Sequence, residues 1–577
     1  MEFENLSLVD RKIIVGIDFG TTYSGVAWAE TRHPDRRIAI TTWPISETNR
    51  EAESSDKVPT QLWYKDNKRH WGFAIPPNAP PEEILEWFKL DLDPSLQSMG
   101  VAANNAVARG GREVEELVTD YVSAIGEHLQ YMLREKLGEG LMKCTPLEFV
   151  VTVPAIWSDL AKQRTIKACQ MAPALSLDND AKIHLVAEPE AAAIYALRGL
   201  DPHGLGVGDS FVICDAGGGT VDLISYTITK LHPVLEVEEL TVGTGGLCGS
   251  TFINSRFSSF LTAKLGDEEG FDDEVLAEAM EKFEKTIKRQ FTMGARPGDI
   301  YMVPVGGLAN NKALGINRGR FSLKASDLKT IFDPVVQEAI SLVQDQIKSS
   351  RDPIKAVLLL GGFGSSTYLK ERLREVVPKT TAVIQPPNAW LAVVQGAVMK
   401  GLALSAPQHL TTVRVQNRKA RKHYGVRLHK QFNEEKHHHI RQRRYWSKYD
   451  GHWRIDGMTW FLRRGDPVPE DKPHYQSVFF CRPVSDGLIT RATIQIYADR
   501  TSKEAPIAVQ ESVELLCDLT IDLSHIPRSG FKEVRGKDGA WYYKVATEIE
   551  VIYHSASTQY TLIYNGQRFN TVTSEYV

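Results

Sequence analysis

Cysteine is scarce in this chain, with six among 577 residues. None of the six belongs to a CxxC pair or to another spacing typical of metal ligands. One of them, Cys214, falls in an apolar run that predicts a buried strand. These features indicate a reduced, intracellular compartment.

Long apolar runs and an excess of basic charge are also missing. No uninterrupted apolar stretch approaches membrane-spanning length, and the first residues, Met1-Glu2-Phe3-Glu4-Asn5, are acidic without an apolar signal core. The net charge of −4 gives no chain-wide basic field for nucleic acid or anionic lipid. With 42% hydrophobic and 24% charged residues the composition is that of a globular protein. We therefore expect a cytoplasmic protein, with a nuclear location as the alternative, that does not span a membrane; nucleic acid is not an expected partner, and any contact with it would be local.

Two glycine-rich turns, far apart in the chain, each follow an apolar run of strand length. They are Asp18-Phe19-Gly20-Thr21-Thr22-Tyr23 and Asp215-Ala216-Gly217-Gly218-Gly219-Thr220-Val221-Asp222. Backbone N–H groups in such turns point into a common concavity and bind phosphate oxygens, and the threonine hydroxyls add donors. The repeat of strand, turn and acid predicts two lobes of similar build that close on one phosphorylated ligand.

Three aspartates, Asp18, Asp215 and Asp222, accompany these turns. Carboxylates repel phosphate, but Mg²⁺ between a carboxylate and a phosphate reverses the sign of the interaction. The acids therefore predict a bound magnesium ion. The alternative is that both turns are ordinary loops with solvated acids.

Two regions of different character follow one another along the chain. From Ile13 to about Leu402, β-rich runs alternate with helical patterns, which predicts a layered α/β body. Within it, Glu113 to Glu135 and Asp327 to Ile347 have the apolar spacing of helices. From about residue 405 onward, alternating segments separated by turns predict a smaller, mainly antiparallel β domain.

A basic stretch, residues 414 to 448, opens the second region and includes His437-His438-His439. It is read as a solvated linker or domain surface, with a contact to RNA or phosphoinositide as the alternative. The three histidines are read as part of a solvated charged loop, with metal binding as the alternative.

Five blocks resemble, in order, the seventy-kilodalton heat-shock (DnaK-type) chaperones of the actin and sugar-kinase superfamily. They are Ile17 to Ser24, Thr152 to Ala155, Glu188 to Ala193, Asp215 to Asp222, and Leu360 to Gly362. The segment Gly246-Leu247-Cys248-Gly249-Ser250-Thr251-Phe252 is most similar to the divergent branch called heat-shock protein family A member twelve. The resemblance implies an actin-like ATPase domain over residues 1–404, with ribonuclease H-like duplicated lobes. Lobe I would span about 12–200 plus about 391–404, and lobe II about 205–390.

The resemblance also implies roles for residues, with ATP or ADP and Mg²⁺ as cofactors. Asp18, Asp215 and Asp222 would hold Mg²⁺, largely through its waters. Lys89 would position the attacking water, Glu188 would complete the acidic ring and Thr220 would face the γ-phosphate, so Lys89, Glu188, Asp215 and Thr220 are the catalytic candidates. Nucleotide contacts are expected from Gly20, Thr21, Thr22, Tyr23, Gly217, Gly218, Gly219, Thr220, Gly249, Glu284, Lys288, Gly361, Gly362 and Phe363.

The chain departs from the family pattern in several places. Phe363 follows the adenosine-side glycines where the family has Ser-Thr-Arg, and it could cover the adenine by stacking. Glu284 and Lys288 resemble the second-lobe residues that contact adenosine in the family, although the spacing between them differs by one residue. The acidic, hydrophobic linker is replaced, and residues 405–577 resemble a truncated substrate-binding domain without its helical lid.

The leading hypothesis is an ATP-binding, slowly hydrolysing chaperone-like protein whose nucleotide state controls a β domain that binds protein segments. The expected partners are extended or unfolded protein segments or specific proteins, and a co-chaperone or exchange factor is a further candidate. One alternative is a nucleotide-gated scaffold with negligible hydrolysis. Another is a small-molecule kinase of the same superfamily, for which no carboxylate base is visible.

Overall fold

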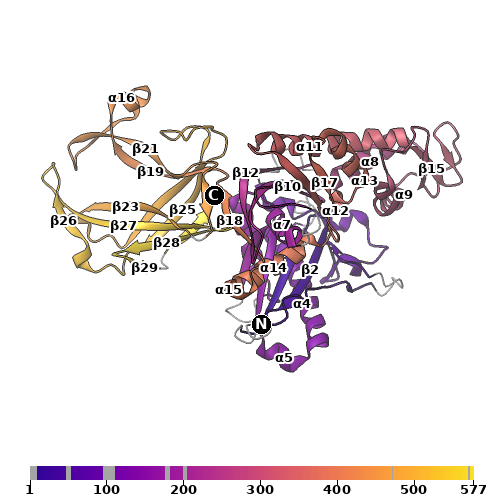
Figure 1. The fold of residues 1–577 in the computed structure, drawn as a ribbon, viewed down its shortest axis with the longest axis horizontal. Coiled ribbons are helices and arrows are strands. Elements are labelled where there is room, and N and C mark those ends of the chain that lie inside the picture. Colours follow the sequence, from indigo (N-terminus) through magenta and orange to yellow (C-terminus); the bar gives the residue numbers. More distant parts are fainter. Residues whose placement is uncertain are drawn as a thin grey trace. The chain divides into compact units, whose positions relative to one another are not determined.

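The computed structural model describes residues 10–46, 54–94, 111–175, 182–198, 204–470, 472–569 and 572–576. The chain divides into two compact units, Met1–Arg414 and Val415–Val577, which are described separately (Figure 1). Met1 to Asn5, on which the expectation of a missing signal core rested, lie outside the described residues. No helix in the described ranges is both long enough and apolar enough to cross a membrane.

The first lobe of the N-terminal unit is built on a sheet in which the strand order is β3-β2-β1-β8-β9. Its strands are β1 (Ile13–Asp18), β2 (Tyr23–Glu30), β3 (Ile38–Ala39), β8 (Leu147–Val153) and β9 (Lys182–Ala187). β1 runs antiparallel to β2 and parallel to β8, which in turn is parallel to β9. β1 is buried along its whole length because α14 (Ala392–Ser405) packs on it, and α14 also packs on α7 (Glu188–Arg198).

The second lobe repeats this order, with β12-β11-β10-β16-β17 in the place of β3-β2-β1-β8-β9. Its strands are β10 (Ser210–Ala216), β11 (Val221–Lys230), β12 (Leu235–Gly246), β16 (Ile354–Leu360) and β17 (Ala382–Ile384). β10 is antiparallel to β11 and parallel to β16, as β1 is to β2 and β8. The repeat confirms the expected duplicated, two-lobed α/β fold.

Amphipathic helices cover the two sheets. α4 (Val114–Leu137) and α11 (Ala325–Ser349) match the two helices expected from apolar spacing, each extending two residues beyond the expected C-terminal end. Figure 1 shows α8 (Ser250–Leu265), α9 (Asp273–Lys282), α11 and α13 (Thr367–Val376) in one part of the second lobe, with β15 (Arg320–Lys324) at its outer edge. The other elements of this unit are β4 (Val58–Pro59), β5 (Gln61–Lys65), β6 (Lys68–Trp71), β7 (Leu85–Glu86), α5 (Glu139–Cys144), α6 (Asp159–Met171), α10 (Lys288–Gln290), β13 (Ile300–Pro304), β14 (Ile316–Asn317), β15 (Arg320–Lys324), α12 (Gly361–Gly364) and α15 (Pro407–Leu410), with short 3₁₀ or π turns η2 (Gly72–Ala74), η3 (Pro81–Glu83), η4 (Leu90–Leu92) and η6 (Phe283–Ile287).

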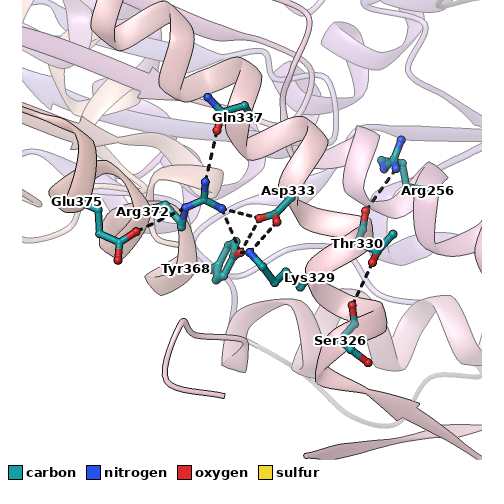
Figure 2. A network of polar contacts seen from close by, with 9 residues as sticks. All are labelled: Arg256, Ser326, Lys329, Thr330, Asp333, Gln337, Tyr368, Arg372 and Glu375. Carbon is teal, nitrogen blue, oxygen red and sulfur yellow. Dashed lines mark hydrogen bonds and ion pairs between the residues drawn. The ribbon is translucent and has the colours of Figure 1, made fainter. Parts of the chain in front are cut away.

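A polar network joins α11 to α13 (Figure 2). Asp333 on α11 accepts hydrogen bonds from the Tyr368 hydroxyl at 2.6 Å and from Arg372 Nη1 at 2.5 Å, both on α13. Lys329, one turn earlier on α11, donates to the other oxygen of Asp333 at 2.7 Å. The network fixes the start of α13, and therefore the short α12 turn that precedes it, relative to the rest of the lobe.

The C-terminal unit consists mainly of two antiparallel sheets. One has the order β20-β21-β19-β24-β25-β30, and the other has β23-β27-β28-β29 with β26 paired to β27. A shared core, which includes Val426, Ile496, Leu519 and Val551, fills the space between their apolar faces. Its elements are β18 (Val413–Lys419), β19 (His423–Gln431), α16 (Glu434–His437), η7 (His438–Arg443), β20 (Tyr445–Ser447), β21 (His452–Leu462), β22 (Pro467–Pro469), β23 (His474–Pro483), η8 (Val484–Asp486), β24 (Arg491–Asp499), β25 (Val513–Asp522), η9 (Arg528–Gly530), β26 (Lys532–Arg535), β27 (Trp541–Tyr553), β28 (Thr558–Tyr564), β29 (Gln567–Phe569) and β30 (Val572–Tyr576).

The three adjacent histidines of this unit are not all solvated. His437 is buried, and its Nδ1 accepts a hydrogen bond from the Asn433 N–H at 3.1 Å. Throughout the described ranges, no three His, Cys, Asp or Glu side chains gather closely enough to hold a metal ion. The structure therefore gives His437 a local structural contact, which the expectation of a solvated loop did not include.

Candidate functional site

The N-terminal unit contains a cavity of about 330 Å³ lined by residues of both lobes. The turn between β1 and β2 and the turn between β10 and β11 both line this cavity. An added Cβ at Gly218 would lie 2.4 Å from Thr22 Oγ1, and one at Gly219 would lie 2.7 Å from Thr21 Oγ1. The two glycine turns are therefore in direct contact, and only glycine allows this approach.

Nearly all of the expected site residues line this one cavity, although they come from distant parts of the chain. Asp222 and Gly249 are the exceptions. Gly249 packs behind the second turn, where an added Cβ would meet the Gly218 carbonyl oxygen at 2.2 Å. The expected residues that line it are Asp18, Gly20, Thr21, Thr22, Tyr23, Lys89, Glu188, Asp215, Gly217, Gly218, Gly219, Thr220, Glu284, Lys288, Gly361, Gly362 and Phe363.

Lys89 is a buried lysine whose ammonium faces the first residue of α7. Its Nζ donates to Glu188 Oε1 at 2.6 Å, and its side chain is only 2% exposed. The ammonium also lies over the rings of Phe19 and Trp157, at 5.6 and 5.3 Å from their centroids. These contacts hold one positive charge at a fixed place in the wall of the cavity.

The buried carboxyl groups around Asp215, which come from both lobes, repel one another. Asp215 and Asp222 lie opposite one another on β10 and β11. Burial raises the pKa of Asp215 well above its usual range, and the charges of Glu188, Asp18 and Asp222 raise it further. Burial raises the pKa of Glu188 to about 7 in spite of the opposing charge of Lys89. A cation placed among these carboxylates would relieve the repulsion.

The donor chemistry of this acidic group fits Mg²⁺ held mainly through water. Asp222 Oδ1 accepts from the Ala155 and Ile156 N–H groups at 3.0 and 3.3 Å, while its buried Oδ2 has no hydrogen-bond partner among the described residues. Asp18 and Asp215 line the cavity while Asp222 does not, and no three His, Cys, Asp or Glu side chains in the described ranges form a direct cluster of metal ligands. Mg²⁺ commonly keeps several waters and takes few direct protein ligands. Asp18, Asp215 and Asp222 therefore suit a hydrated ion.

The cavity also contains the residues expected to contact the nucleotide base. Glu284 lies on the π-helical turn η6, and Lys288 begins α10. A π turn contains one residue more than an α turn. This accounts for the spacing between Glu284 and Lys288, which differs by one residue from the family pattern. Lys288 donates to Glu284 and, at 3.0 Å, to Asn254 Oδ1. Burial lowers the pKa of Lys288 although Glu284 opposes the shift.

Phe363 lines the cavity but has little surface to offer a ligand. It is 3% exposed and belongs to the hydrophobic core of the second lobe. Trp390, which sequence reasoning missed, lines the same end of the cavity. Its ring meets Tyr23 edge-on at a centroid distance of 6.0 Å, and the Arg289 guanidinium lies 5.9 Å from its centroid. Trp390 is therefore better placed than Phe363 to stack on a base.

Lys57 is a second residue that the sequence analysis missed. Its Nζ donates to Asp18 Oδ2 at 2.6 Å, and the residue lines the cavity. The only signal in the sequence is a lysine directly before Val58-Pro59, and such a lysine would be unremarkable on a solvated loop. The remaining cavity residues that were not expected are Ser250, Arg289, Ser365, Ser366, Trp390 and Val393.

Comparison with known proteins identifies relatives of this chain. Heat shock 70 kDa protein 12A of Homo sapiens is 24% identical over 477 residues, which cover 68% of this chain and 69% of the relative. Heat shock 70 kDa protein 12B of Homo sapiens is 23% identical over 479 residues, 68% of either chain. Chaperone protein HscA homolog of Rickettsia africae (strain ESF-5) is 25% identical over 402 residues, 69% of this chain and 58% of the relative. The first two relatives confirm the expected similarity to the divergent member-twelve branch.

Two family models also match. The model described as "Domain of unknown function (DUF8568)" matches residues 418–577, which correspond to the C-terminal unit. The model described as "Hsp70 protein" matches residues 104–430, more than half of the chain. The protein accordingly belongs to the Hsp70 family.

Proposed function

We propose that the protein binds ATP or ADP with Mg²⁺ in the cavity of the N-terminal unit and hydrolyses ATP slowly. The observation that carries the proposal is the contact between the two glycine turns at the wall of a cavity that also contains acids and buried lysines. Phosphate binding at paired N–H-lined turns needs this convergence. Membership of the Hsp70 family and the chaperone relatives add support for a nucleotide-binding, chaperone-like protein.

The roles follow from the chemistry of the side chains. The N–H groups and hydroxyls of the two turns bind phosphate oxygens. Lys89, held by Glu188, orients the attacking water, and Thr220 faces the transferred phosphate. Mg²⁺, when bound, neutralises charge on the phosphate oxygens. Phosphoryl transfer demands mainly positioning and electrostatic stabilisation, which fixed charges can provide.

The proposal extends to the C-terminal unit, whose binding of protein segments would depend on nucleotide state. Exposed aromatic side chains on β23 and β27, Tyr475, Phe479 and Trp541, offer apolar contacts for an extended segment. A nucleotide-gated scaffold with negligible hydrolysis is the second candidate. The altered adenosine side, where the buried Phe363 follows the two glycines, favours it because such a departure can change turnover without abolishing binding.

One experiment separates these candidates. Calorimetry and phosphate release are measured side by side with ATP and GTP, with and without extended peptides. Stoichiometric binding with slow release that changes on adding peptide supports the chaperone-like function, whereas stoichiometric binding without release selects the scaffold. Absence of nucleotide binding in every condition would refute both. Turnover measured with a polyol in place of the peptides tests the small-molecule kinase, which stimulation by the polyol would support.

A further inference from the structure

Lys57 lies in the first lobe, beside Asp18 in the wall of the cavity. The residue is 6% exposed, and its ammonium contacts Asp18 Oδ2 at 2.6 Å. The Thr152 hydroxyl donates to the other carboxylate oxygen, Asp18 Oδ1, at 3.1 Å. Both oxygens of Asp18 therefore already have protein partners.

The neighbouring strand β2 leaves room for the Lys57 side chain. Lys57 directly precedes β4, which pairs with β2 through Ser24 opposite Val58. Across from the lysine, β2 carries Gly25, and an added Cβ there would lie 3.2 Å from Lys57 Cγ and 3.4 Å from Cε. The missing side chain at Gly25 leaves the space in which the Lys57 stem lies.

Among the described residues, three lysine–carboxylate pairs line the cavity, one of them Lys288 with Glu284, and the other two have equal length. Lys89 pairs with Glu188 at 2.6 Å, and Lys57 pairs with Asp18 at 2.6 Å. Lys57 therefore places a fixed positive charge beside a carboxylate that would otherwise repel phosphate and attract a divalent cation. A phosphate group that approaches this wall meets an ammonium as well as a carboxylate.

We infer that Lys57 is a positioning residue that holds Asp18 and supplies part of the positive charge at the phosphate end of the cavity, so that nucleotide binding depends less on Mg²⁺ than the acids alone would require. The inference rests on the proposed nucleotide binding. It assigns a specific electrostatic task to a residue that the motifs do not contain.

The first test is the affinity for ADP and ATP, measured by calorimetry on the 577-residue chain in Mg²⁺ and in EDTA. Removal of Mg²⁺ should weaken binding to the wild type by less than about tenfold, and should weaken binding to Lys57→Met by about a further tenfold, since a charge-assisted contact is lost. Lys12→Met is the matched control. Lys12 pairs with Glu148 at 2.7 Å at the other end of β1, outside the cavity, so its loss should leave the Mg²⁺ dependence unchanged.

Gly25→Ala keeps every charge but crowds the Lys57 stem. Its nucleotide affinity should depend on Mg²⁺ to a degree between those of the wild type and Lys57→Met, and it carries the test if Lys57→Met does not fold.

Mg²⁺ alone gives a second readout without nucleotide. It should raise the Tm of Lys57→Met more than that of the wild type or Lys12→Met, because the acids then lack an internal cation.

The outcomes separate the inference from the proposed function. One outcome is that the wild type binds nucleotide and loses the same factor in affinity on removal of Mg²⁺ as Lys57→Met and Gly25→Ala do. In that case the inference is wrong and nucleotide binding stands. An equal response of all three Tm values to Mg²⁺ also counts against it. If the wild type binds neither ADP nor ATP in either buffer, the proposed function fails, and the inference fails with it.

Discussion

Lys89 Nζ lies 2.6 Å from Glu188 Oε1, which joins the segment before η4 to the first turn of α7. The Lys89 side chain is 2% exposed, and its ammonium lies over the rings of Phe19 and Trp157. A lysine held so rigidly has lost the conformational freedom that makes most surface lysines poor positioning groups. Its place in the cavity wall is the basis for the first prediction.

Lys89→Ala should reduce ATP turnover by at least about 100-fold while the chain still binds ATP, because positioned proton-transfer and water-orienting groups contribute on this scale. Glu188 can then take up a proton, so the fold should survive. Single-turnover phosphate release and calorimetry measure the two properties. Lys12→Ala, which breaks a similar pair outside the cavity, is the control. Equal turnover in Lys89→Ala and the wild type would remove Lys89 from the proposed mechanism.

The pKa of Glu188 predicts how stability depends on pH in the absence of ligand. Burial raises this pKa from 4.5 to about 7. Between pH 4.5 and about 7, the folded chain holds a proton on Glu188 that the unfolded chain has released. The contribution of Glu188 to the free energy of unfolding is therefore complete below pH 4.5 and is lost as the pH rises to about 7. The raised pKa of Asp215 acts in the same direction.

The free energy of unfolding, measured by urea titration without Mg²⁺, should therefore fall across this pH range. Glu188 alone should account for about 3 kcal/mol of the fall, and Asp215 should add to it. Asp215→Asn removes one buried titratable carboxyl group, so it should be more stable than the wild type at pH 7 and should show a shallower slope. A wild-type stability that rises from pH 5 to pH 7 with the same slope in Asp215→Asn would contradict the assignment.

Trp390 gives a prediction for the base end of the cavity. Trp390→Ala should weaken ATP binding by about fivefold to 100-fold, the range expected for loss of base stacking on an aromatic ring. Binding of inorganic tripolyphosphate, which has no base, should change little. Phe363→Leu should have the smaller effect on ATP because Phe363 is a core residue. Equal losses for ATP and tripolyphosphate would show that Trp390 acts through the fold of the cavity and not through a base.

The sequence predicts most of the phosphate end of this site because its signals are local. Asp18 is the last residue of the buried strand β1 and Asp215 is the next-to-last residue of the buried strand β10, and the following glycines allow the tight turns, so each half is visible in a few consecutive residues. The repeat of this unit predicts the duplicated lobes, and the two sheets confirm it.

The residues that sequence reasoning missed depend on contacts across the fold. Lys57 reaches Asp18 only because β4 pairs with β2, and no short motif contains both residues. Trp390 meets Arg289 and Tyr23, which come from opposite lobes. Phe363 was expected to be available for stacking, but the α12 turn directs it into the core. The pattern around Phe363 gives the residue type and cannot give the direction of its side chain.

The last prediction concerns the contact that supports the first lobe, where α14 packs closely on α7. An added Cβ at Gly396 would lie 1.7 Å from the Ala191 carbonyl oxygen and 2.5 Å from its carbon, both backbone atoms that cannot turn aside. Gly396→Ala should therefore destabilise the chain by about 2–4 kcal/mol, as overpacking against a rigid neighbour does. Gly140→Ala is the matched control, because Gly140 lies in helix α5 with nothing within 4 Å of its added Cβ. Alanine favours a helix by about 0.5–1 kcal/mol over glycine, so the control should be neutral or stabilising. Urea titration of the two variants measures the difference, and similar unfolding midpoints would show that α14 can move away from α7 at little cost.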